Sequence, residues 1–168
     1  MIKETTGQIT LIPENVPEEL RELDQWIVWR YEERDGDWTK IPYVPYTPYR
    51  ASSTNAADWR PFDEAAGAYR ASVSDSTRPY GGVGFVFTEA DPYAGLDLDH
   101  ARNPKTGEIA PWVQEILERV EGGYVEISPS GRGIHIIVRA EVRNGGIRKG
   151  NVEMYSRGRY FTVTGNVL

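Results

Sequence analysis

The stretch VGFVFTEADPYAGLDLD, residues 83–99, contains two runs with the apolar spacing of β-strands, separated by the turn-forming residues EADP at 89–92. We expect the two runs to pair as a β-hairpin. Successive side chains of a strand point to opposite faces, so Asp97 and Asp99 share one face while Leu96 and Leu98 occupy the other. The stretch therefore predicts a sheet that is apolar on one side and acidic on the other.

Two later runs carry polar residues in the same alternation. In IHIIVRA, residues 134–140, His135 lies on the face opposite two isoleucines, and in VEMYS, residues 152–156, Glu153 lies opposite Val152. The three strands therefore offer one apolar face and one polar face. The polar face bears Asp97, Asp99, His135 and Glu153.

Short elements are expected on both sides of these strands. A helix should begin at Pro17, and the runs at 26–33 and 37–43 should pair as a hairpin around a glycine-containing turn. A second helix should begin at Thr54 or Asn55 and run to about Ser72.

The remaining elements complete an α+β pattern. Apolar residues at the spacing i, i+3, i+4 and i+7 predict a helix over 111–121, and the run at 160–164 is typical of a strand. Trp26 and Trp29 are expected in the core. Hairpins with one crossover helix, without a regular βαβα alternation, favour the α+β class.

The composition limits the kind of protein that this chain can be. It has 168 residues, a formal net charge of −6 and no cysteine. The length fits one domain, and the lack of cysteine excludes disulfide frameworks and thiolate metal sites. No apolar run is long enough to cross a membrane, and residues 1–15 lack the pattern of a secretory signal. We therefore expect a cytoplasmic protein with no membrane partner.

The acidic total argues by itself against a nucleic-acid partner, because neutralisation of phosphates is the usual source of such affinity. The charges are unevenly distributed, however. Residues 128–160 contain seven Lys or Arg and two Asp or Glu, a local net charge of +5, so the other segments sum to −11. Phosphate binding at this basic segment is therefore compatible with the acidic total.

The acidic face has the residues for a metal site. Two aspartates two apart on a strand, with a third carboxylate from another strand, supply the oxygen ligands that Mg²⁺ or Mn²⁺ prefers. Two such ions about 3.5 to 4 Å apart are the usual device for phosphoryl transfer. Asp97, Asp99 and Glu153 are the candidate ligands. The alternative is a solvated sheet edge whose acids only keep the protein soluble.

The loop SPSGRGIH, residues 128–135, has the composition of a phosphate-binding segment. Glycines let backbone amides converge on an anion, and serine, arginine and histidine side chains add hydrogen-bond donors. The alternative is an ordinary glycine-rich hairpin loop. The candidate residues are Ser128, Ser130, Gly131, Gly133 and His135.

Three further basic side chains are candidates for phosphate contacts. Arg157 and Arg159 follow Glu153 closely, and the planar guanidinium suits a triphosphate or a nucleic-acid backbone. Lys40, in the first hairpin, could also reach a phosphate. The alternative for all three is an exposed, solvated side chain.

Seven segments, read in order, resemble the primase-polymerases of phages and plasmids in the archaeo-eukaryotic primase superfamily. They cover most of the chain from Trp26: WIVWRYE, TKIPY, RASSTNAADW, GFVFTEADP, GLDLDH, EISPSGRGIH and EMYSRGRYFTVTG. The resemblance implies a single catalytic domain over residues 1–168. It would join a smaller N-terminal αβ module, residues 16–78, to an RRM-like catalytic module with a mixed or antiparallel sheet, residues 79–168.

The resemblance also implies the metal ligands. Asp97 and Asp99 match the first motif of the family and Glu153 matches its third, and in the family these residues hold two divalent ions, Mg²⁺ or Mn²⁺. The basic residue after the third motif corresponds to Arg159, and less closely to Arg157.

The Ser-x-His motif of the family meets the phosphates of the incoming nucleotide. Its histidine corresponds to His135, but Gly133 stands at the serine position. The hydroxyl must therefore come from Ser128 or Ser130, or be absent.

The expected function is template-directed DNA priming or polymerisation, with two-metal nucleotidyl transfer from dNTP or NTP to a primer or initiating nucleotide on single-stranded DNA. Expected partners are template, primer and a helicase or accessory region in the same or a separate chain. Two alternatives stay open: a non-catalytic module that binds nucleotide or single-stranded nucleic acid, and a metal-dependent nuclease, which would not release pyrophosphate.

Overall fold

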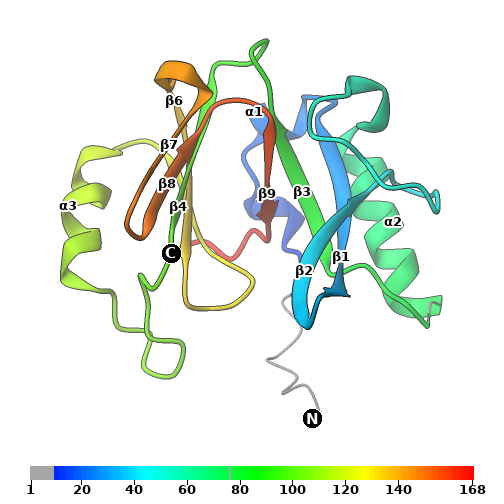
Figure 1. Cartoon of the computed structure of the whole chain (residues 1–168), viewed down its shortest axis with the longest axis horizontal. Helices are drawn as coiled ribbons and strands as arrows, with labels where there is room; N and C mark the ends of the chain where they lie inside the picture. The colour runs from blue at the N-terminus through cyan, green and yellow to red at the C-terminus, as the bar shows by residue number, and fades with distance from the viewer. Residues whose placement is uncertain (1–9, 76) are drawn as a thin grey trace.

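The computed structural model describes residues 10–75 and 77–168, and within these ranges nine strands form two antiparallel sheets (Figure 1). The four-stranded sheet has the order β2-β1-β3-β9 and the five-stranded sheet has the order β5-β6-β4-β8-β7. The expected α+β class is confirmed. The strands are β1 (Trp26–Arg34), β2 (Asp37–Tyr43), β3 (Gly82–Phe87), β4 (Tyr93–Leu98), β5 (Tyr124–Ile127), β6 (Ile134–Arg139), β7 (Gly146–Lys149), β8 (Val152–Tyr155) and β9 (Arg159–Val163).

Two helices lie at the two ends of this arrangement, with α3 beside the five-stranded sheet and α2 beside the four-stranded sheet (Figure 1). The α-helices are α1 (Glu18–Arg21), α2 (Phe62–Asp75) and α3 (Pro111–Arg119), and short 3-10 helices lie at Pro13–Asn15, Ala56–Asp58 and Arg143–Gly145. The helices expected near Pro17 and over 111–121 are confirmed. The second helix begins later than expected, because the side chain of Asn55 accepts a hydrogen bond from Ala57 N and caps the 3-10 helix instead of α2.

The pairing of β1 with β2 confirms the first expected hairpin. The expected pairing of residues 83–87 with residues 93–99 is wrong, because β3 pairs with β1 and β9 whereas β4 pairs with β6 and β8. All residues of β3 are buried, and β4 is buried at every position except Asp97, which is partly exposed. Both strands are therefore central strands of two different sheets, and the segment between them crosses from one sheet to the other.

A second crossing lies beside the first. The chain leaves the five-stranded sheet after β8 and enters the four-stranded sheet at β9, so residues 157–158 do not form a hairpin turn. The backbone N–H of Gly158 donates to Phe87 O (3.1 Å), and Arg157 forms an ion pair with Glu89. The four-stranded sheet thus takes strands from both sides of the boundary expected near residues 78 and 79.

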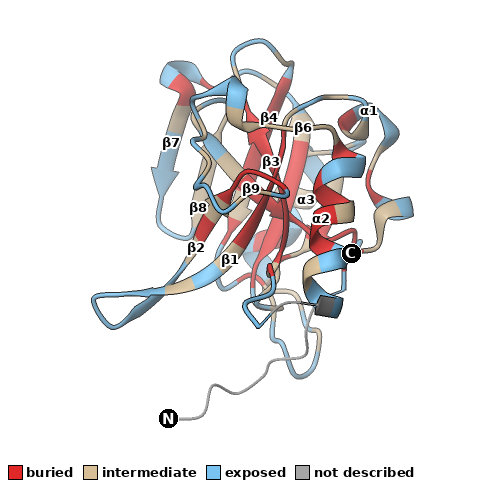
Figure 2. Cartoon of the chain, turned by 90° about the vertical axis from the view of Figure 1, so that its right-hand side faces the viewer, coloured by how far each residue is buried: buried red, intermediate tan, exposed pale blue. Residues whose placement is uncertain are grey.

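The largest core cluster lies on one face of the four-stranded sheet. Trp26 is fully buried and packs edge-on against Phe62 of α2 (4.8 Å between ring centroids) and Phe85 of β3 (5.3 Å). Its indole N–H donates to Leu20 O (3.0 Å), which ties α1 to the same core. Trp29 is also buried, so both tryptophans expected in the core are confirmed, and Figure 2 shows the buried residues concentrated in the strands and the inner side of α2.

The two faces of the five-stranded sheet have different neighbours. Leu96, Leu98, Ile134 and Ile136 form an apolar cluster with Val113 of α3. On the opposite face, a Cβ added to Gly95 would come within 2.4 Å of the Phe161 ring and 2.6 Å of the Phe87 ring. Glycine at this position lets the four-stranded sheet approach β4 closely, just ahead of the acidic residues.

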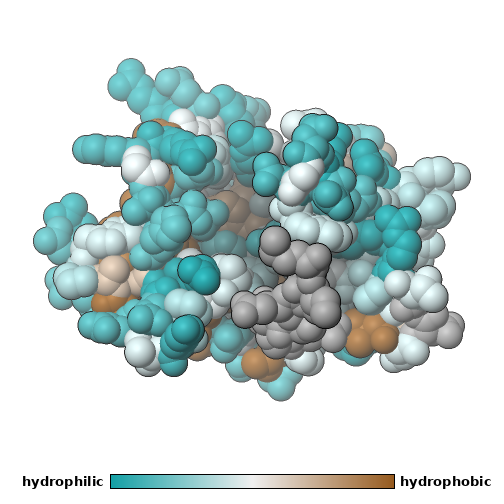
Figure 3. All heavy atoms as spheres, turned by 60° about the horizontal axis from the view of Figure 1, so that its bottom comes forward, coloured by the Kyte–Doolittle hydropathy of each residue, from teal (hydrophilic) through white to brown (hydrophobic). Residues whose placement is uncertain are grey.

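The helices and one face of the surface can be compared with what a membrane or a large apolar interface would need. None of the helices in the described ranges is long and apolar enough to span a bilayer. Figure 3 shows a mainly hydrophilic face, on which hydrophobic residues appear in small separate groups. Exposed hydrophobic residues of this scattered kind are ordinary for a folded protein.

Candidate active site

A row of polar side chains crosses the five-stranded sheet on the face opposite α3. The register places Glu126 of β5 beside His135 of β6, His135 beside Asp97 of β4, Asp97 beside Glu153 of β8, and Glu153 beside Arg148 of β7. Each strand contributes one residue, because the strands pair in a register that keeps these positions side by side. We call these five residues the polar row.

The centre of the polar row is Asp97. Nε2 of His135 lies 3.6 Å from its Oδ1. Burial raises the pKa of Asp97 above its usual value, and the charges of Asp99 and Glu153 raise it further, whereas His135 and Lys40 oppose the increase. Several carboxylates that disfavour one another's ionisation mark a place where an added cation would be stabilised.

Lys40 reaches this site from the four-stranded sheet. Burial lowers the pKa of its ammonium, and the charges of Asp97 and Asp99 act in the opposite direction. The side chain also lies over the ring of Trp29, with Nζ 5.4 Å from the ring centroid. The structure therefore brings the lysine of the first hairpin close to the two aspartates, although they come from different sheets.

Glu153 has partners for both of its carboxylate oxygens. Nε of Arg148 lies 3.0 Å from Oε1, and the hydroxyl of Tyr155 donates to Oε2 (2.6 Å). The guanidinium of Arg159 lies over the Tyr155 ring, with 5.0 Å between Cζ of Arg159 and the ring centroid. Arg159 is thus joined to the polar row through Tyr155.

The three candidate metal ligands have the right chemistry but do not form a closed cage. Asp97 and Glu153 are neighbours in the register, and Asp99 is exposed just after the end of β4. Across residues 10–75 and 77–168, no three His, Asp or Glu side chains converge as a metal site. Asp97 and Glu153 share one face of the sheet, and the oxygen donors of all three residues fit a divalent ion. Glu153 would have to exchange a present partner for the ion.

The glycine-rich loop between β5 and β6 is held by its own serines. Oγ of Ser128 lies 3.0 Å from Oγ of Ser130 and accepts from the backbone N–H of Gly133 (3.1 Å). A Cβ added to Gly133 would lie 2.9 Å from the same Oγ. Ser128 therefore fills the space that a side chain at Gly133 would occupy, and Gly131 makes the turn with a positive φ of 71°.

The two candidate arginines take different places. Arg157 pairs with Glu89 of the first crossing, not with the polar row, while Arg159 lies at Tyr155. Both arginines line a cavity of about 1060 Å³. The two partners of Glu153, Arg148 and Tyr155, also line this cavity, as does Trp59. The cavity is large enough for a nucleotide and opens beside one end of the polar row.

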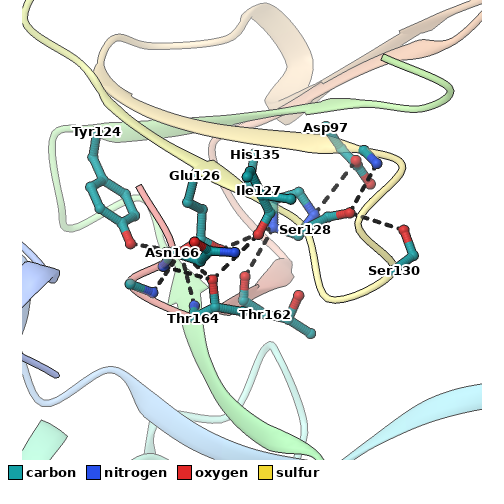
Figure 4. A network of polar contacts seen from close by, with 12 residues as sticks. Asp97, Tyr124, Glu126, Ile127, Ser128, Ser130, His135, Thr162, Thr164 and Asn166 are labelled. Atoms are coloured by element: carbon teal, nitrogen blue, oxygen red, sulfur yellow. Dashed lines mark hydrogen bonds and ion pairs between the residues drawn. The ribbon is translucent and has the colours of Figure 1, made fainter. Parts of the chain in front are cut away.

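Two members of the polar row were missed in the sequence. Glu126 and Arg148 lie on short strands whose alternation alone does not mark them as site residues. Figure 4 shows Glu126 next to His135 and to Thr164 after β9. The pattern YVEIS places Tyr124 and Glu126 on one face of a strand. An acidic residue within a strand was the signal in the sequence that could have identified Glu126 as a site residue.

The chain was compared with protein-family models and with known proteins. No protein-family model matches it. The chain is similar to the DNA primase-polymerase of Nitratiruptor phage NrS-1, with 37% identity over 151 residues that cover 86% of the chain and 19% of that relative. It thus spans about a fifth of the length of the relative. Identity at this level over 86% of the chain supports its identification as a chain of the phage primase-polymerase type.

Proposed function

We propose that this chain is the catalytic part of a template-directed DNA primase-polymerase, with the archaeo-eukaryotic primase fold. The observation that carries the proposal is the polar row, in which a histidine and two carboxylates from three strands lie side by side. The relationship to a DNA primase-polymerase supports the same activity. Its substrates would be nucleoside triphosphates and a primer or initiating nucleotide on single-stranded DNA, with a helicase or accessory region as a further partner.

The proposed metal ligands are Asp97, Asp99 and Glu153, with Mg²⁺ or Mn²⁺ as the ions. When bound, two such ions activate the attacking 3′ hydroxyl and neutralise the leaving pyrophosphate. The raised pKa of Asp97 supports this assignment, because burial and neighbouring carboxylates disfavour its charge until a cation is present.

The proposed triphosphate contacts surround these carboxylates. His135 and Lys40 face Asp97 from two sheets, and Arg159 lies over Tyr155 at the mouth of the cavity. In the loop, Ser128 supplies the hydroxyl beside Gly133. These groups would orient the α-phosphate toward the primer and balance its negative charge. The other proposed phosphate contacts, Ser130, Gly131 and Arg157, lie at the loop and at the crossing.

The direct test is incorporation of labelled nucleotide by the purified chain on a primed single-stranded template with Mg²⁺ or Mn²⁺. We expect template-dependent extension with one pyrophosphate released for each nucleotide added, and loss of extension with a chelator. Release of nucleotide monophosphates from the template without extension would instead identify a nuclease. Metal-independent binding without any turnover would identify a binding module.

Lys40→Met provides a test of the triphosphate contacts. A charge-assisted hydrogen bond contributes about 1.5–3 kcal/mol, so the KM for the nucleoside triphosphate should rise about tenfold or more, with a smaller change in kcat. Steady-state incorporation kinetics measure both constants. Lys40→Arg keeps the charge and should retain most of the affinity. An unchanged KM in Lys40→Met would remove Lys40 from the proposed contacts.

A further inference from the structure

A buried carboxylate closes the polar row on β5. The Glu126 side chain is 1% exposed, and its Oε2 accepts hydrogen bonds from the Tyr124 hydroxyl (2.6 Å) and from the backbone N–H groups of Thr164 (2.8 Å) and Gly165 (3.0 Å). In the part of the chain that the structure describes, Oε1 has no hydrogen-bond donor and lies 3.5 Å from Nδ1 of His135. A buried carboxylate oxygen without a close donor is costly and therefore needs an explanation.

The surroundings of His135 Nδ1 fix where its proton lies. This nitrogen is 3.0 Å from the backbone oxygen of Thr162 and 3.5 Å from Oε1 of Glu126 (Figure 4). A carbonyl oxygen only accepts hydrogen bonds, so Nδ1 has to be the donor to Thr162 O. The proton position thus follows from the two neighbouring acceptors and not from the ring itself.

The rest of the ring is also constrained. His135 is 6% exposed, and its ring lies 5.1 Å from the Phe161 ring at an interplanar angle of 33°. With Nδ1 turned toward Glu126 and Thr162, Nε2 is the ring nitrogen that faces Asp97, at 3.6 Å from Oδ1. The imidazole is therefore oriented from three sides before any substrate arrives.

We propose that Glu126 is a positioning residue for His135. Thr162 O accepts the Nδ1–H, and the charge of Oε1, 3.5 Å from Nδ1, favours the proton on this nitrogen. The two groups together fix the proton and the direction of the ring, so that Nε2 points to Asp97 and to the phosphates of the substrate. Carboxylates and carbonyls behind a functional histidine commonly have this effect on its tautomer and orientation. The substrate part of this inference rests on the proposed function, whereas the ring geometry does not.

Glu126→Gln is the deciding variant. The amide oxygen can take the place of Oε2 and keep its donors, which also include the Thr164 hydroxyl (3.2 Å). The NH₂ group then faces the Nδ1–H of His135, a donor against a donor. In the wild-type protein, imidazole ¹⁵N–¹H NMR should show a slowly exchanging proton on Nδ1 of His135. In the variant this resonance should shift upfield and exchange faster, or disappear. The value of kcat/KM for incorporation should fall about tenfold or more.

Tyr124→Phe is the matched control. It removes one donor from Oε2 and leaves Oε1 facing His135, so the Nδ1–H resonance should change much less than in Glu126→Gln. Exposed His100 provides an internal NMR reference. Either of two results overturns the inference: no proton on Nδ1 in the wild-type protein, or equal shifts in the two variants. If Glu126→Gln does not fold, the absence of a proton from Nδ1 in the wild-type protein still overturns the inference.

The NMR result and the activity result separate the two proposals. If the Nδ1–H resonance shifts in Glu126→Gln but the wild-type protein incorporates no nucleotide, the positioning of His135 is upheld and the polymerase proposal is contradicted. Normal incorporation by the wild-type protein together with an unchanged resonance in Glu126→Gln would contradict the positioning of His135 alone.

Discussion

Replacement of Asp97 by asparagine should lower the rate of nucleotide incorporation at least about a hundredfold, because bound metal ions contribute several kcal/mol of transition-state stabilisation. Asparagine has nearly the same shape but no charge to attract a cation. Asp97 lies between His135 and Glu153 in the polar row, so no other carboxylate can take its position without a shift of a strand. Single-turnover primer extension over a range of Mn²⁺ concentrations measures the loss.

The same variant should fold at least as well as the wild-type protein. Burial raises the pKa of Asp97, which means that the fold disfavours its charged form, and asparagine removes that charge. Thermal unfolding should therefore give an unchanged or higher Tm. Asp37→Asn, at the exposed start of β2, is the matched control and should keep full activity. Activity of Asp97→Asn within about tenfold of wild type would contradict the metal assignment.

Trp26→Ala should lower the free energy of unfolding by about 3–5 kcal/mol, the usual range for removing a large buried aromatic side chain. The variant loses two edge-on ring contacts, with Phe62 and Phe85, and leaves Leu20 O without its indole donor. For a chain of this size the Tm should fall by roughly 6 to 20 °C. Chemical denaturation, with the midpoint and slope fitted separately, measures the free energy.

Trp26→Phe separates packing from the hydrogen bond. Phenylalanine restores most of the ring contacts but not the indole N–H, so it should recover more than half of the loss seen in Trp26→Ala. Trp112, on α3, is partly exposed, and Trp112→Ala should cost much less because little of its surface is removed from water. A loss in Trp26→Ala no larger than that in Trp112→Ala would contradict the central place of Trp26 in the core.

Local patterns in the sequence were enough to predict the faces of single strands. Alternation placed Asp97, His135 and Glu153 on one face of their strands, and the structure brings these three side by side. The helix over 111–121 followed from its apolar spacing, and α3 lies at Pro111–Arg119. Both inferences depend only on the geometry of one element, which the sequence specifies locally.

The pairing of the strands could not be predicted from such local patterns. Turn residues at 89–92 are compatible with a hairpin and equally with a crossing between sheets, since both need a change of direction. Packing decides between the hairpin and the crossing. The rings of Phe87 and Phe161 pack directly on Gly95, so the four-stranded sheet lies against this face of β4. Glu126 and Arg148 joined the polar row only through the register of β5 and β7, which depends on partners far away in the sequence.

The place of β9 in the four-stranded sheet has a consequence for how the protein acquires its structure during synthesis. β3 pairs with β1 on one side and β9 on the other, but β9 is synthesised after all five strands of the other sheet. Until then β3 presents a free edge of unpaired backbone groups, which is prone to pair with other chains. The two sheets must therefore mature together, and a nascent chain that ends before residue 159 should be vulnerable to aggregation.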